Sequence, residues 1–207
     1  MTIRATLWDW GGVIQRTEDP SPRRSLEAQL GLPVGGLDHA VFESPVWKLA
    51  STGRCSADEA WEAIAASLDI PADGIDALVR CFFAGDRVDE TLVALIRHLR
   101  GEGIAVGLLS NAPPGRTRGS ATARWGMEGL FDAQVFSYET GVLKPDSRMY
   151  RAGLAALGVD AREVVFIDDS PANIAGARAV GIDAILFRGA PALLTALRAR
   201  GLPVPEG

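Results

Sequence analysis

The sequence predicts an α/β fold: a doubly wound parallel sheet into which one helical module is inserted. Two observations lead to this prediction. Short apolar runs alternate with amphipathic helical patterns along most of the chain, as strands buried on both faces and their crossover helices do. Between residues 15 and 88 this alternation stops, and the chain has helical and loop patterns only.

The expected strands are apolar throughout and lie at residues 3–8, 104–109, 133–136, 164–167 and 184–187. The expected helices between them each have one apolar stripe and cover residues 89–100, 116–125, 147–157 and 171–180. Pro171 suits the first turn of a helix, and Gly158 and Gly181 suit helix ends. The tail, residues 202–207, contains two prolines and is expected to be irregular.

The inserted module has its own helix signals. Ser21 and Pro22 begin a helix that ends at Gly31, and the capping box of residues 56–59 begins a second helix. A third helix is expected at about residues 73–84. We therefore expect a core domain of residues 1–14 and 89–207 and a helical module of residues 15–88, which is long enough to be a lid over a site.

Composition and charge exclude several classes of protein. The 207 residues include 21 Lys and Arg and 26 Asp and Glu, which gives a net charge of -5 and argues against a nucleic-acid partner. No apolar run approaches the roughly 18–20 residues that a membrane span needs. The start of the chain lacks the pattern of a secretory signal. We expect a cytoplasmic protein with no membrane partner.

Few residues could support thiol or imidazole chemistry. Cys55 and Cys81 lack a C-x-x-C spacing and metal-ligand companions, so we expect two buried, reduced thiols. The histidines are His39 and His98, and neither is an obvious base for a Ser-His or Cys-His hydrolase. Lysine is almost wholly replaced by arginine, so a lysine at a chemically meaningful position stands out.

Polar residues lie after four of the expected strands, either directly or in the loop that follows the strand. They are Asp9, Ser110 with Asn111, Lys144, and Asp168 with Asp169. Ligands of open parallel sheets bind beyond the carboxyl ends of the strands, where these residues would converge. Asp9 and the acidic pair could instead cap local backbone groups. Lys144 precedes a helix N-terminus, where a cation is disfavoured unless an acidic neighbour or an anionic ligand is close.

The order of these motifs resembles that of the haloacid dehalogenase-like (HAD) hydrolase superfamily. The motifs are D-x-x-G-V from Asp9, S-N at Ser110, G-V-L-K-P-D around Lys144, and D-D-x-x-x-N from Asp168 to Asn173. The segments LFDAQVFSYETGVLKPDSRMY and VVFIDDSPANIAGARAVGI are particularly similar to that family. The resemblance covers nearly the whole chain and implies a Rossmann-like core with an α-helical cap after the first strand.

The resemblance also implies Mg²⁺-dependent phosphoryl transfer to Asp9, with a small phosphorylated metabolite as substrate. Ser110 and Lys144, together with backbone groups of Gly11, Gly12 and Asn111, would hold the phosphate. The protein ligands of Mg²⁺ would be Asp9, the Gly11 carbonyl and Asp169. Asp168 would act on Lys144 or on a metal-bound water, and Asn173 would position the loop. A monomer or a weak homodimer is expected.

The sequence departs from the main family pattern at Gly11, where most phosphatases of the family have a second aspartate as general acid and base. Its absence leaves three hypotheses open. The first is a phosphatase whose leaving group needs little protonation, such as the relatives that hydrolyse sugar 1-phosphates. The second is a metal-independent 2-haloacid dehalogenase, which the acidic pair Asp168–Asp169 argues against. The third is a catalytically weak protein that binds phosphorylated ligands or a partner.

Substrate choice is expected to come from the cap. Candidate wall residues are Arg16, Trp47 and Arg54, although Trp47 could be core and Arg54 could be a solvated loop residue. Alternation along the first strand turns Trp10 away from Asp9. Arg116 and Arg118 follow the Ser110–Asn111 loop and could meet an anionic substrate or remain solvated.

Overall fold

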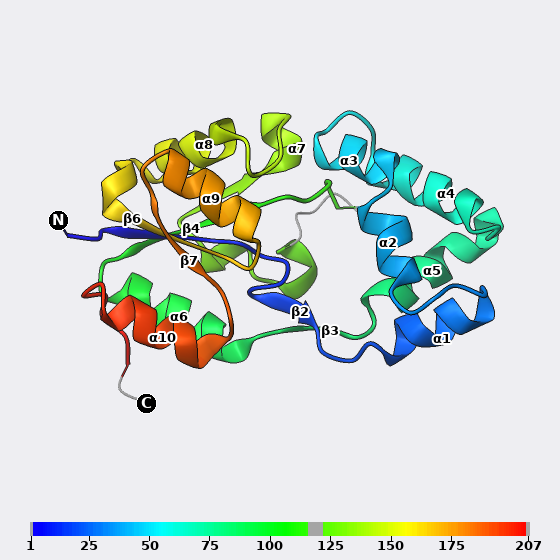
Figure 1. Cartoon of the computed structure of the whole chain (residues 1–207), viewed down its shortest axis with the longest axis horizontal. Helices are drawn as coiled ribbons and strands as arrows, with labels where there is room; N and C mark the ends of the chain where they lie inside the picture. Colours follow the sequence, from blue (N-terminus) through cyan, green and yellow to red (C-terminus); the bar gives the residue numbers. More distant parts are fainter. Residues whose placement is uncertain (1, 116–121, 206–207) are drawn as a thin grey trace.

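The computed structural model describes residues 2–115 and 122–205 (Figure 1). At its centre is a five-stranded sheet in the order β5-β4-β1-β6-β7, with every neighbouring pair parallel. The strands are β1 (Ala5–Trp8), β4 (Ala105–Ser110), β5 (Ala133–Phe136), β6 (Val164–Asp168) and β7 (Asp183–Leu186). The predicted α/β class with a parallel, doubly wound sheet is therefore confirmed.

The central strand, β1, fixes where the site lies. In β1, Trp8 lies opposite Leu108 of β4 and Ile167 of β6, so all three strands end at the same edge of the sheet. The backbone N–H of Asp9 donates to the carbonyl of Ile167 at 2.9 Å, which holds the first residue after β1 against β6. The residues that follow these strands are thus brought together by strand register alone.

Helices cover both faces of the sheet (Figure 1). One face carries α6 (Glu90–Gly101) and α10 (Ala190–Arg198), and the other carries α8 (Ser147–Leu157) and α9 (Pro171–Ala179). Side chains alternate between the two layers of core, as the pleat of a strand requires: Trp8 packs with the first pair of helices and Leu7 with the second.

Local signals set the ends of these helices. The Asp89 side chain accepts from the N–H groups of Thr91 and Leu92 at the start of α6. Gly158, with φ 65°, ends α8 as predicted. Shorter elements complete the core: α7 (Ser137–Thr140) and the 3₁₀ turns η2 (Ala123–Trp125), η3 (Glu128–Leu130) and η4 (Ala161–Glu163).

The inserted segment forms a separate group of helices with its own apolar core (Figure 1). The helices are α1 (Ser21–Gln29), α2 (Gly36–Phe42), α3 (Pro45–Ser51), α4 (Ala57–Ser67), η1 (Ala72–Gly74) and α5 (Ile75–Phe83). The predicted capping box is present at the start of α4: Ser56 Oγ accepts from the Glu59 N–H, and the Glu59 carboxylate accepts from the Ser56 N–H. We refer to residues 15–88 as the cap.

Other expectations about these segments were incomplete. The cap also contains β2 (Gln15–Thr17) and β3 (Asp86–Val88), an antiparallel pair where the chain enters and leaves the core. These strands are only three residues long and mostly polar, so they lack the alternation of apolar and polar residues that predicts a strand. The expected helix 116–125 falls partly outside the described residues, and its described end is the turn η2. The helix α10 was not predicted, and residues 202–205 are irregular as expected.

The expectation of two buried cysteines was wrong, because both Cys55 and Cys81 are partly exposed. The Cys81 sulfur lies 3.1 Å from the Pro22 carbonyl, and the Cys55 sulfur lies 3.6 Å from the Val46 carbonyl. A thiol can donate weakly to a carbonyl, so neither residue needs a wholly apolar environment. Across the described part of the chain, no helix has both the length and the apolar character of a membrane span.

Candidate active site

Lys144 lies between two carboxylates that come from the ends of different strands. Its Nζ is 2.7 Å from Asp9 Oδ1 and 2.7 Å from Asp168 Oδ2. Only 1% of the lysine side chain is exposed. Burial alone would lower the pKa of the ammonium group, but the charges of Asp9 and Asp168 outweigh it and raise that pKa. The acidic neighbours expected for Lys144 are therefore present on both sides.

Asp9 is held in a fixed position at the end of β1. Its Oδ1 accepts from the Trp10 N–H at 2.8 Å as well as from Lys144. Burial raises the pKa of Asp9 to about 7, against the opposing effect of the Lys144 charge. The Trp10 ring packs edge-to-face against Phe131 in the core, with 6.5 Å between ring centroids, which agrees with the expectation that it turns away from Asp9.

Asp168 is fully buried, and three groups make four contacts with its carboxylate. The Ser170 N–H donates to Oδ1 at 2.8 Å, and the Asn173 amide is 3.0 Å from both oxygens. Lys144 makes the remaining contact. The contact of Asp168 with Lys144 is thus present. The Tyr150 hydroxyl donates to the Asn173 carbonyl at 2.8 Å, a support that the sequence did not reveal.

Asn111 holds the backbone on which Lys144 sits. The Lys144 N–H donates to Asn111 Oδ1 at 2.8 Å, and the Asn111 amide donates back to the Lys144 carbonyl at 3.1 Å. This reciprocal pair connects the loop after β4 to the loop that carries the lysine. Ser110, at the end of β4, is buried and lines the same cleft. Ser110, Asn111 and Lys144, which were expected to hold phosphate, thus lie together at the end of β4.

The donor set at this edge of the sheet suits a hard divalent cation. Asp9, Asp168 and Asp169 each offer a carboxylate oxygen, and the three oxygens lie within 4.8 Å of one another. Burial and the charge of Asp168 raise the pKa of Asp169, and a cation would relieve both effects. Both oxygens of Asp168 already accept from Asn173, whereas Asp9 meets Trp10 and Lys144 through Oδ1 alone. Asp9 and Asp169 are therefore the better candidates to hold Mg²⁺.

Gly12 leaves room for the Asp169 carboxylate. A Cβ at Gly12 would lie 2.2 Å from Asp169 Oδ2, and the residue has φ 82°. A side chain at this position would displace the Asp169 carboxylate and would be strained at this φ, so glycine suits the position for two independent reasons. A Cβ at the neighbouring Gly11 would meet no atom within 4 Å, so the space beside Asp9 is open there.

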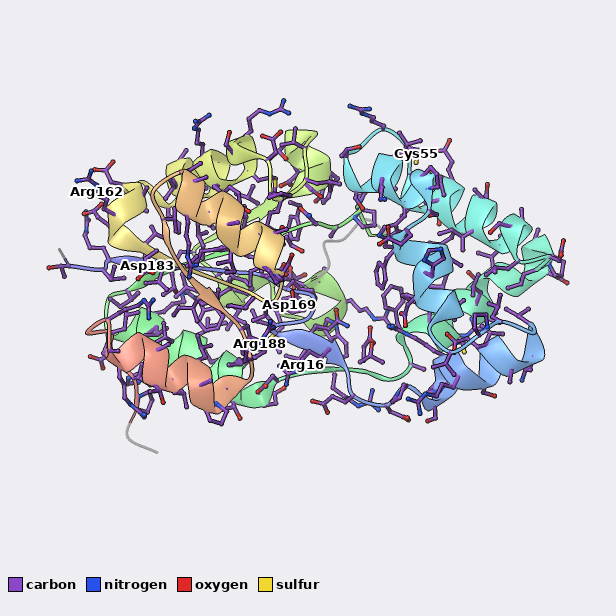
Figure 2. The ribbon with its side chains drawn as sticks, viewed as in Figure 1. Arg16, Cys55, Arg162, Asp169, Asp183 and Arg188 are labelled. Atoms are coloured by element: carbon purple, nitrogen blue, oxygen red, sulfur yellow. The ribbon has the colours of Figure 1, made fainter. Side chains whose placement is uncertain are left out.

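A cleft of about 1220 Å³ opens at these residues and continues between the core and the cap. Its core side includes Asp9, Ser110, Lys144 and Asp169, and its cap side is formed by residues of the five helices α1 to α5 and of β2 and β3. Figure 2 shows Asp169 on the side of the core that faces the cap, and Arg16, on β2, at the junction of the two. A substrate bound at Asp9 would therefore extend toward the cap.

The expected wall residues lie in different places. Arg16 lines the cleft, but its guanidinium is paired with Asp89 at 2.7 Å. Trp47 also lines the cleft and packs on its aromatic neighbours in the cap. Arg54 is exposed and is absent from the described residues that line the cleft. Arg116 and Arg118 lie outside the described residues.

Comparison with known proteins gives concordant results. A family model described as haloacid dehalogenase-like hydrolase matches residues 3–181. A sesquiterpene phosphatase of Aspergillus oryzae is 28% identical over 181 residues, which cover 87% of this chain and 88% of that protein. A phosphoglycolate phosphatase of Cereibacter sphaeroides is 38% identical over 94 residues, which cover 45% of this chain and 42% of that protein.

The structure is also similar to that of a HAD family enzyme from Bacteroides thetaiotaomicron, solved in complex with magnesium and inorganic phosphate. The TM-score is 0.68 at 22% sequence identity, and the match covers 90% of this chain and 94% of that one. At this identity the likeness concerns the fold.

Proposed function

Because the chain belongs to the haloacid dehalogenase-like hydrolase family, whose model matches residues 3–181, we propose that it is a Mg²⁺-dependent phosphomonoesterase. The observation that carries the proposal is Lys144 buried between Asp9 and Asp168, with the Asp169 carboxylate beside them. This arrangement places a carboxylate nucleophile next to a fixed positive charge, which phosphoryl transfer needs.

In the proposed reaction, a carboxylate oxygen of Asp9 attacks phosphorus, and the ester oxygen leaves with the bonding electron pair. Water then attacks the aspartyl-phosphate, which releases inorganic phosphate and restores the Asp9 carboxylate. Lys144 neutralises charge on Asp9 and on the phosphoryl oxygens in both steps. Ser110 and the backbone N–H groups of the Gly11–Gly12 and Asn111 loops would bind those oxygens.

Mg²⁺ would be held by Asp9, Asp169 and the carbonyl of Gly11. When bound, it supplies positive charge to the phosphoryl group. The other charged and polar groups act by holding Lys144: Asp168 contacts its ammonium group at 2.7 Å, and the Asn111 side chain holds its backbone at 2.8 Å and 3.1 Å. We propose that these two side chains position the lysine and do not touch the substrate.

We propose that residues 15–88 act as a cap that covers the bound ester and excludes water. One contact between core and cap supports this role. The Ser137 hydroxyl donates to the Ser51 carbonyl of the cap at 2.5 Å and accepts from the Ala112 N–H, in the loop after β4, at 3.0 Å. Ser137 thus connects the cap to the loop that follows Ser110 and contains Asn111.

Gly11 has no side chain that could act as a general acid. General acid–base catalysis typically raises a reaction rate by about 10²–10⁴-fold. We therefore propose a substrate whose leaving group needs little protonation. The acidic pair Asp168–Asp169, at a site suited to a cation, favours phosphate ester hydrolysis over dehalogenation. The full-length relative from Aspergillus oryzae is a phosphatase, which supports the same choice. A cytoplasmic monomer or weak homodimer remains our expectation.

A panel of phosphorylated metabolites, assayed for phosphate release with Mg²⁺ and with EDTA, tests the proposal. Acetyl phosphate belongs in the panel because its leaving group needs little protonation. We expect release with Mg²⁺ and none with EDTA. No turnover and no phosphate burst on any compound would leave a protein that only binds phosphorylated ligands. Chloride release from 2-chloropropionate without metal would instead indicate a dehalogenase.

A further inference from the structure

Resting on the proposed function, we propose that the substrate is a phosphate monoester of a large apolar alcohol or phenol. The phosphate would bind at Asp9 and Lys144, and the apolar group would lie against an aromatic wall on the cap. We define this wall as Phe42, Trp47, Trp61 and Phe83, all of which line the cleft.

The aromatic wall is one continuous surface built from four helices. Ring centroids are 6.0 Å apart for Phe42 and Trp47, 5.4 Å for Trp47 and Trp61, and 6.0 Å for Trp61 and Phe83, each pair edge-to-face. Phe82 packs behind them with no exposed surface. Edge-to-face packing fixes these rings relative to one another, so the wall is preformed.

Part of the aromatic wall is exposed to solvent, although large apolar side chains are usually buried. Phe42 is 46% exposed and is one of the few large apolar side chains with so much free surface in the described chain. It faces the same cleft as Asp9 and Lys144. An apolar patch in a concave site that also holds convergent polar groups is typical of a ligand pocket. An apolar substrate group would cover it.

The charged residue within this part of the cap is already neutralised. The Arg23 side chain is only 9% exposed, its Nη2 is 3.0 Å from Asp86, and Asp38 contacts its Nη1. Its Nε donates to the Phe82 carbonyl at 2.6 Å, and its guanidinium stacks over the Phe82 ring at 4.0 Å. Arg23 therefore has little capacity left for a charged or hydroxylated substrate tail.

Of the other arginines of the cleft, Arg16 is paired with Asp89 at 2.7 Å, and Arg80 and Arg124 lie at the solvent side. Arg80 and Arg124 are both exposed, and the Arg124 guanidinium covers the outer ring of Phe83 at 4.5 Å. From the core, Ala112, Pro113 and Trp125 face the cleft. The space between the phosphate site and the solvent is thus bounded mainly by apolar groups, and its volume of about 1220 Å³ exceeds what a two- or three-carbon ester fills.

A series of 4-alkylphenyl phosphates, from methyl to octyl, separates substrate size from leaving-group chemistry. The phenols of this series leave equally well, so a trend in kcat/KM reports contact between the alkyl chain and the cleft. We expect kcat/KM to rise about threefold for each methylene group until the chain fills the cleft. Phosphotyrosine, which has a phenolic leaving group and a charged tail, should be among the poorest substrates. A flat or falling trend would overturn the proposal.

The variant Phe42→Ala tests the wall itself. Because Phe42 is half exposed, its loss should leave the fold intact. We expect about a tenfold loss of kcat/KM on 4-octylphenyl phosphate and little change on phenyl phosphate. Val34→Ala is the matched control, since Val34 is 80% exposed and lies away from the cleft. An equal effect of Phe42→Ala on both esters would contradict the assignment.

The two proposals fail in different ways. If no ester is hydrolysed, the proposed function fails, and calorimetric binding of 4-octylphenyl phosphate and phenyl phosphate to the wild-type chain decides the present inference. Tighter binding of the octyl compound, weakened by Phe42→Ala, would support the aromatic wall. Equal binding of the two compounds would overturn it. If esters are hydrolysed without regard to alkyl length, the proposed function stands and the substrate class is wrong.

Discussion

The carboxylate of Asp169 occupies the space that a side chain at Gly12 would fill, because a Cβ there would lie 2.2 Å from Asp169 Oδ2. A larger residue at this point of the loop after β1 would therefore displace the Asp169 carboxylate in the loop after β6. The pair also places the Asp169 carboxylate beside Asp9, where a cation could bridge the two.

Gly12→Ala should displace Asp169 and weaken Mg²⁺ binding. The new Cβ collides with the carboxylate, and alanine is strained at φ 82°. We expect the Mg²⁺ concentration for half-maximal activity to rise by at least about tenfold. Gly101→Ala is the control, since a Cβ there meets no atom within 4 Å and the residue lies at the end of α6, outside the residues that line the cleft. Equal Mg²⁺ dependence of the two variants would show that Asp169 is not a ligand.

Lys144→Arg should impair catalysis although the charge is kept. The lysine is 1% exposed and lies 2.7 Å from each of two carboxylates, so a larger planar guanidinium must displace Asp9 or Asp168. We expect kcat to fall by about a hundredfold. Lys48→Arg is the matched control, because Lys48 is exposed and pairs only with Glu43 on the surface. Wild-type kcat in Lys144→Arg would contradict the positional role of the ammonium group.

Lys144→Met should destabilise the fold as well as abolish activity. It removes the positive charge between the buried carboxylates of Asp9 and Asp168. Removing one partner of a buried ion pair typically costs roughly 3–5 kcal/mol. Urea unfolding at neutral pH measures the loss. A variant as stable as the wild type would show that the charge of Lys144 does not stabilise the two buried carboxylates.

Gly11→Asp should restore a general acid beside the nucleophile. The position is exposed to the cleft and has free space. We expect a gain of roughly 10²-fold on an alkyl phosphate, whose alkoxide needs a proton, and a much smaller gain on acetyl phosphate. The measurement is kcat/KM on both compounds for the variant and the wild type. Equal gains on both would argue that proton transfer is not what Gly11 lacks.

Mg²⁺ should stabilise the protein more in mild alkali than in mild acid. Burial raises the pKa of Asp9 from its ordinary value to about 7, so without metal the folded state binds a proton more tightly than the unfolded state. The charged carboxylate is then a cost to stability that is present above about pH 7 and disappears as the pH falls toward about 4.

Mg²⁺ competes with that proton, so the increase in Tm from EDTA to saturating MgCl₂ should be larger at about pH 8 than at about pH 6. Asp9→Asn should remove most of this difference. The same increase in Tm at both pH values in the wild type would argue against Asp9 as a shared site for proton and metal.

The sequence predicted those parts of the site that strands position directly. Asp9 follows a buried apolar run and Asp168 ends one. Lys144 precedes a helix N-terminus, which is unfavourable for a cation unless anions are near. Parallel register then brings the strand ends together without further information. This is why the cluster could be expected before its geometry was known.

The supports of the site could not be predicted, because they depend on packing between distant elements. The Tyr150 hydroxyl reaches a carbonyl 23 residues away, and the Ser137 hydroxyl reaches Ser51 across 86 residues. The strands β2 and β3 are equally non-local, since Thr17 Oγ1 donates to Asp86 Oδ1 at 2.7 Å. Nothing in the residues around these positions signals the partner. The aromatic wall has the same origin, since its four rings come from four helices.

The location of the phosphoryl group after reaction tests the central claim most directly. The enzyme is mixed with Mg²⁺ and acetyl phosphate, quenched in acid within the first turnover, digested and examined by mass spectrometry. We expect a phosphoryl group on the peptide that contains Asp9, and none there in Asp9→Asn. A phosphoryl group on any other residue, or full turnover by Asp9→Asn, would contradict it.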